Sequence, residues 1–152
     1  MATEKDFTIV ELSSLSWPTD LRLPSARFRL FVAADVTSVA AESIAGFAHS
    51  ALANGMVYFC AWGPGCERFH DLVDEVVAAD DPCRRQSPDN KGQDTIMTTW
   101  HDDETLGEAL DFFISCSLPT AGFEPGSNHW VAISTNPEWV VTIHQRLMET
   151  LK

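Results

Sequence analysis

Short apolar runs alternate with amphipathic segments from residue 27 to the end of the chain. Four of the runs have the length and composition of strands, and they span residues 27–34, 56–61, 95–100 and 129–134. The segments between them repeat apolar residues at helical spacing. The last helical segment begins with Asn136-Pro137-Glu138, which combines an N-cap, a proline suited to the first helical position and an acidic first turn.

This alternation of strands and helices predicts an α/β fold with a parallel sheet. Parallel strands need crossover connections, and right-handed crossovers place helices on both faces of the sheet. We therefore expect a three-layer α/β/α sandwich with about four parallel strands. The expected topology is flavodoxin-like or Rossmann-like, with the strand order 2-1-3-4 when the strands are numbered along the chain.

The beginning of the chain does not follow the alternation. Its length of 152 residues fits one domain, so we expect a single α/β domain over residues 27–152 and an N-terminal extension, residues 1–26, packed on it. Within the extension, residues 7–12 are expected to add an extra strand at the edge of the sheet. Residues 80–94 contain two prolines, a glycine and few apolar residues, which predicts a mobile loop.

The chain is strongly acidic, with 22 Asp and Glu against 10 Lys and Arg and a net charge of -12. Contacts to phosphates dominate affinity for nucleic acids, so this charge argues against a nucleic-acid partner. The negative charge favours a binding partner that is cationic, either a basic protein surface or a small organic cation. The sequence shows neither a run of about 18 apolar residues nor a signal-peptide pattern, so we expect no membrane partner and a cytoplasmic location. A homo-oligomer remains an open alternative.

The carboxyl ends of the predicted strands carry the candidate binding residues, because ligands of open parallel sheets bind beyond these ends. Asp102, Asp103 and Glu104 are more acids than a helix cap needs, and we expect Asp102 or Asp103 to be the cap. Trp62 and Trp100 either flank one cleft for an organic cation or cover the upper core. The predicted binding residues are Asp35, Trp62, Trp100, His101, Asp102, Asp103, Glu104 and Thr135.

Two chemical alternatives use the same edge. A catalytic site would consist of Cys66, His101 and Asp102, with Cys66 as the nucleophile, whereas the other interpretation places Cys66 in the core. A site for Mg²⁺ or another divalent ion would use the carboxylates of Asp35, Asp102 and Asp103, whereas the other interpretation is a solvated acidic turn. No phosphate-loop motif is present, and Arg68 replaces the third glycine of a dinucleotide loop, so we expect no cofactor.

The segment from Cys60-Ala61-Trp62-Gly63-Pro64 through Asp74, together with Trp100-His101-Asp102-Asp103, resembles a small bacterial domain family of unknown function. The resemblance covers about the last two-thirds of the chain; it implies a bacterial origin and assigns no functional residues. We expect a non-catalytic binding or accessory protein, of the immunity or regulatory type, whose acidic edge meets a cationic partner. The alternative is a small enzyme or a metal- or ligand-binding domain with its site at the same strand ends.

Overall fold

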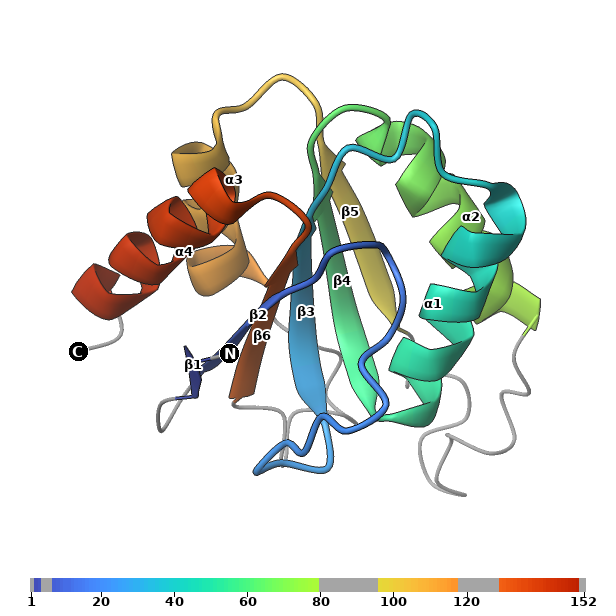
Figure 1. Cartoon of the computed structure of the whole chain (residues 1–152), viewed down its shortest axis with the longest axis horizontal. Helices are drawn as coiled ribbons and strands as arrows, with labels where there is room; N and C mark the ends of the chain where they lie inside the picture. The colour runs from blue at the N-terminus through green and yellow to red at the C-terminus, as the bar shows by residue number, and fades with distance from the viewer. Residues whose placement is uncertain (1, 4–6, 80–95, 118–128, 151–152) are drawn as a thin grey trace.

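A sheet with two helices on each face divides the molecule into three layers (Figure 1). The computed structural model describes residues 2–3, 7–79, 96–117 and 129–150, and the predicted mobile loop lies outside them. Within this part of the chain the strands are β1 (Ala2–Thr3), β2 (Phe7–Glu11), β3 (Phe28–Ala33), β4 (Met56–Trp62), β5 (Met97–His101) and β6 (His129–Ser134). The helices are α1 (Ala41–Ala53), α2 (Cys66–Ala79), α3 (Leu106–Cys116) and α4 (Pro137–Thr150).

The α/β sandwich is confirmed, but the predicted strand order 2-1-3-4 is wrong. The order in the sheet is β1-β2-β6-β3-β4-β5, and β2, β6, β3, β4 and β5 are mutually parallel. When the four predicted strands are numbered along the chain, this is the Rossmann-like order 3-2-1-4. The burial of the strands explains the difference. Every residue of β6 except Trp130 is buried, as its central position requires, whereas Met97 and Trp100 of β5 are exposed, as an edge position allows.

Apolar side chains fill the space on both faces of the sheet. α1 and α2 cover one face, and α3 and α4 cover the other (Figure 1). All six residues of β3 are buried, because helices cover this central strand on both sides. The apolar stripe of α2 meets the first face and consists of Cys66, Phe69, Val73, Val76 and Val77.

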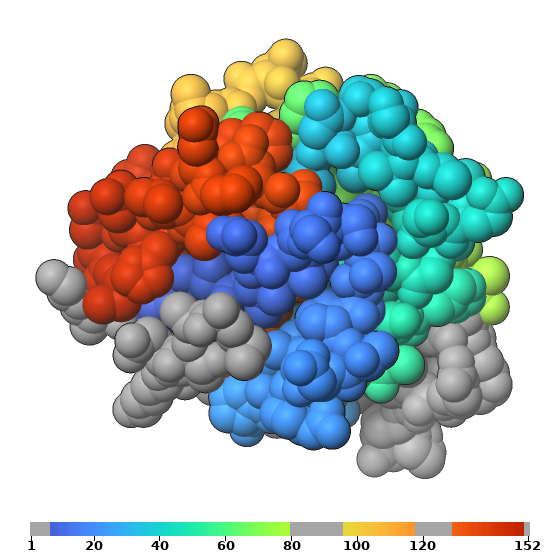
Figure 2. All heavy atoms as spheres, viewed as in Figure 1, coloured from blue at the N-terminus to red at the C-terminus, as the bar shows by residue number. Residues whose placement is uncertain are grey.

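The residues before β3 complete the sheet and part of its cover. β2 pairs in parallel with β6, which confirms the predicted extra strand, and only the two-residue β1 lies outside it. The chain then crosses the face that α1 also covers, where Leu15 and Leu21 are buried and Trp17 stacks on Phe28 at 5.7 Å between ring centroids. Figure 2 shows this segment filling the surface between α4 and α1. Among the described residues, no helix combines the length and the apolar character that a membrane crossing needs.

Candidate functional site

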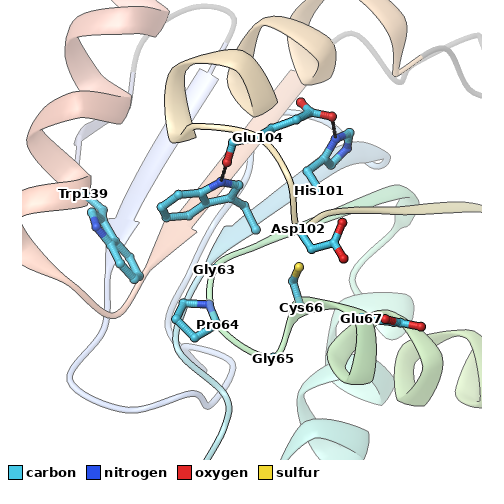
Figure 3. A pocket seen from close by; sticks show the side chains of 10 residues that line it. Gly63, Pro64, Gly65, Cys66, Glu67, His101, Asp102, Glu104 and Trp139 are labelled. Carbon is cyan, nitrogen blue, oxygen red and sulfur yellow. Dashed lines mark hydrogen bonds and ion pairs between the residues drawn. The ribbon is translucent and has the colours of Figure 1, made fainter.

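A cavity of about 590 Å³ opens beyond the carboxyl ends of β4 and β5 (Figure 3). Its volume lies within the range of small-molecule sites, about 300–1,000 Å³. Three segments form it: the turn from β4 into α2, the turn from β5 into α3, and the first turn of α4. The lining residues are Trp62, Gly63, Pro64, Gly65, Cys66, Glu67, His101, Asp102, Glu104 and Trp139.

The turn between β4 and α2 is held close against the chain that follows β3. Gly63 has φ +118°, and a Cβ there would lie 2.4 Å from the carbonyl oxygen of Ala34. The amide of Val36 donates to the carbonyl of Pro64 at 3.0 Å. Because of these contacts, only glycine fits at position 63 without strain. They also fix the backbone of the turn from Gly63 to Gly65, which lines the cavity.

Two tryptophans from different elements form an aromatic wall. The rings of Trp62 and Trp139 meet edge to face, with centroids 5.0 Å apart and planes at 82°. The indole N–H of Trp62 donates to the backbone carbonyl of Glu104 at 2.9 Å, which fixes that ring between the two turns. Both side chains are partly buried, so the wall combines a packed base with an accessible surface. Such tryptophan surfaces attract cations through the ring quadrupole.

Acidic residues from both turns also line the cavity: Glu67, Asp102 and Glu104. The Glu104 carboxylate lies 2.9 Å from Nδ1 of His101, whose Nε2 lies 3.1 Å from the Thr99 hydroxyl (Figure 3). A buried imidazole with partners on both nitrogens therefore orients Glu104. No Lys or Arg occurs among the described residues that line the cavity, so its wall is anionic at neutral pH.

The helix after β5 does not need the preceding acids as caps. Thr105 is the N-cap of α3: its hydroxyl accepts from the Glu108 amide at 3.1 Å, and the Glu108 carboxylate accepts from the Thr105 amide at 3.0 Å. The prediction that Asp102 or Asp103 caps this helix is wrong, because a complete capping box begins at Thr105. Both carboxylates are exposed, and Asp102 lines the cavity.

The three residues of the catalytic alternative line the same cavity, but their surroundings do not activate a thiol. Cys66 is buried, and burial raises the pKa of its thiol, as does the charge of Asp102, toward which its side chain points in Figure 3. Both ring nitrogens of His101 are engaged by Glu104 and Thr99. A catalytic cysteine needs a lowered pKa and an available base, and neither condition is met.

Trp100 does not share a cleft with Trp62. Trp62 is in register with His101, whereas Trp100 is in register with Ala61, so the two tryptophans point to opposite faces of the sheet. Trp100 instead packs against His70 of α2, with ring centroids 4.5 Å apart.

Asp35, Asp103 and Thr135 do not line the cavity. Asp35 accepts from the amide and the hydroxyl of Thr37 at 3.0 and 2.6 Å, and these bonds lower the pKa of its carboxyl. Thr135 donates its amide to Ala33. No three His, Cys, Asp or Glu side chains of the described ranges lie close enough together to hold a metal ion, so the metal ligand set Asp35, Asp102 and Asp103 is not assembled.

Sequence reasoning missed Trp139. It lies in the first turn of α4, and the expected helix start at Asn136 was a usable signal, because the first turn of a helix after a parallel strand lies above the edge where ligands bind. The start itself is confirmed, since the Asn136 side chain accepts from the Glu138 amide at 2.8 Å.

A family model described as "Domain of unknown function (DUF7684)" matches residues 8–146. This match confirms the resemblance to a domain family of unknown function and extends it over nearly the whole chain. No curated protein and no solved structure matches the chain.

Proposed function

The chain belongs to the family "Domain of unknown function (DUF7684)", and we propose that it is an acidic binding protein that holds a cationic side chain of a protein partner in the cavity beyond β4 and β5. The composition of the cavity wall carries this proposal. Trp62 and Trp139 line the same cavity as the acidic residues Glu67, Asp102 and Glu104, and the described lining contains no Lys or Arg.

The two kinds of wall favour the same ligand chemistry. A guanidinium or ammonium group over a tryptophan face gains about 0.5–2 kcal/mol, depending on how far it is desolvated. A carboxylate at about 4 Å adds about 1 kcal/mol in a water-like environment. The net charge of -12 would speed the approach of a basic partner and make its association rate depend on salt.

The enzyme alternative has weaker support. It requires Cys66 to become a thiolate, but burial raises its pKa, and His101 is already bonded to Glu104 and Thr99. The proposed role is therefore that of a non-catalytic accessory protein of the immunity or regulatory type, bacterial in origin. A cytoplasmic location is part of the proposal, since the described cysteines Cys60, Cys66 and Cys116 are free thiols.

Binding of N-acetyl-arginine amide tests the proposal, with the citrulline analogue as a neutral ligand of nearly the same shape. We expect the indole N–H signals of Trp62 and Trp139 to shift in NMR spectra with the arginine ligand, with a dissociation constant of about 1 mM, and to stay in place with citrulline.

Asp102→Asn and Asp103→Asn form the matched protein pair, because both residues are exposed neighbours that lose the same charge and only Asp102 lines the cavity. We expect Asp102→Asn to weaken arginine binding about threefold to tenfold and Asp103→Asn to change it less than about twofold. Equal binding of arginine and citrulline, or equal effects of the two substitutions, would contradict the proposal.

A further inference from the structure

β5 is an edge strand of the sheet in the part of the chain that the structure describes. Among the described strands it pairs only with β4, and that pairing runs from Met97 to His101 without a register shift. The other side of an edge strand presents unpaired N–H and C=O groups that can pair with another chain. Proteins usually block such an edge with lysine, proline or a bulge, and the sequence of β5, MTTWH, contains none of these.

Apolar side chains flank this open edge. Met97 and Trp100 are 41% and 40% exposed, and they are two of the three large hydrophobic residues that are exposed in the described part of the chain. The third, Val141, lies on α4, which packs over β2 and β6 at the other end of the sheet. An open strand edge and exposed apolar side chains therefore coincide at β5.

The charges around β5 indicate what kind of chain fits there. Asp74 of α2 accepts a hydrogen bond from the Thr98 hydroxyl at 3.1 Å, and the Asp71 side chain, beside His70, is 63% exposed. Arg68 lies on the same helix, but its guanidinium donates to the carbonyls of Val36 and Val39. A second copy of this chain would bring the same acids against this border, whereas a basic segment would complement them.

The strand also leads directly into the proposed cation site. His101 ends β5 and lines the cavity, and Asp102 and Glu104 follow it. Side chains of an added strand alternate between the two faces of the sheet, so every second one lies on the face to which His101 points. One extended segment paired along β5 would therefore run along the strand to the end where Asp102 and Glu104 follow it.

We propose that the edge of β5 binds an extended basic segment of the partner as an additional strand, while the cavity takes one of its cationic side chains. This inference rests on the proposed function and names the form of the partner. Backbone hydrogen bonds would supply affinity, and the side chains that face Trp100 and the cavity would supply specificity.

The probe is a peptide of about eight residues in which arginine and valine alternate. Its control is the same peptide with every second backbone amide N-methylated. N-methylation keeps the charges but removes the donors that a strand needs. In about 150 mM salt we expect the parent peptide to bind at least about tenfold more tightly than N-acetyl-arginine amide, and the methylated peptide to lose that gain. Equal binding of the two peptides to the wild-type protein would overturn the inference without any question of folding.

Met97→Lys and Val141→Lys are the matched variants, since each places one positive charge at an exposed large hydrophobic residue. We expect Met97→Lys to weaken peptide binding at least about tenfold and Val141→Lys less than about twofold, while arginine amide binds both variants as it binds the wild type. Equal peptide binding by the two variants overturns the strand proposal. If arginine amide still binds in that case, the proposed function is retained. If the wild-type protein binds neither the peptide nor arginine amide, the strand proposal and the proposed function are both refuted.

Discussion

Replacing Gly63 by alanine tests whether the turn that floors the cavity is as constrained as its geometry indicates. The residue has φ +118°, which costs a non-glycine residue about 1–3 kcal/mol. The new Cβ would also lie 2.4 Å from the carbonyl oxygen of Ala34, a backbone atom directly after β3 whose residue is held by the bond from its amide to the Trp62 carbonyl. Relieving such a contact costs about 1–3 kcal/mol more. We expect Gly63→Ala to reduce the free energy of unfolding by about 2–6 kcal/mol, out of a usual total of about 5–15 kcal/mol.

Gly46→Ala is the matched control, because Gly46 lies inside α1 and a Cβ there meets nothing within 4 Å. Alanine in a helix interior should stabilise the protein by about 0.5–1 kcal/mol. Urea unfolding followed by circular dichroism measures both changes, and thermal unfolding should separate the variants by roughly 5–20 °C for a chain of this size. If the two variants unfold within about 0.5 kcal/mol of each other, the argument about the turn is wrong.

Two further predictions rest on burial. Tyr58 is the single tyrosine, and burial raises its pKa to about 12, so ultraviolet absorbance should show its ionisation near pH 12 in the folded protein and near 10 in urea. The pKa of Tyr58 is higher in the folded protein than in the unfolded chain, so about 2–3 kcal/mol of stability should be present below pH 10 and lost as the pH rises toward 12. An ionisation midpoint near pH 10 in the folded protein would refute this prediction. Cys66 is buried with a raised thiol pKa, whereas Cys116 is exposed, so iodoacetamide at neutral pH should label Cys116 before Cys66. Faster labelling of Cys66 than of Cys116 in mass spectra would support the interpretation of Cys66 as a nucleophile.

The periodicity of the sequence predicted the elements because each signal is local. The run at residues 129–134 coincides with β6, and the buried residues of α2 follow the helical spacing that begins at Cys66. Strand order is not local, since a crossover of given length can return to either side of a strand. The polarity of the third predicted strand, residues 95–100, was nevertheless informative, because a polar strand suits an edge and an apolar one suits the centre.

The candidate site was predictable as an edge of the sheet but not as a set of side chains. Trp62, His101, Asp102 and Glu104 line one cavity, as expected of residues that end or follow neighbouring parallel strands. Trp100 does not line this cavity, because neighbouring residues of a strand point to opposite faces of the sheet and Trp100 precedes His101. The register that fixes these faces is set by the pairing of β5 with β4.

The polarity of β5 therefore affects both the position of this strand in the sheet and the composition of the cavity, and the sequence alone did not show that the two are related. A strand of this composition is left at the edge, next to β4, while β6 takes the central place beside β3. That arrangement puts the turn after β5 beside the end of β4, so the acids of this turn and the tryptophan that ends β4 line one cavity. Among the described strands it also leaves β5 paired on one side only, and β5 ends at His101, which lines this cavity. Had the order been 2-1-3-4, Thr98 and Trp100 would lie inside the sheet, and the acidic turn would have no open strand leading into it.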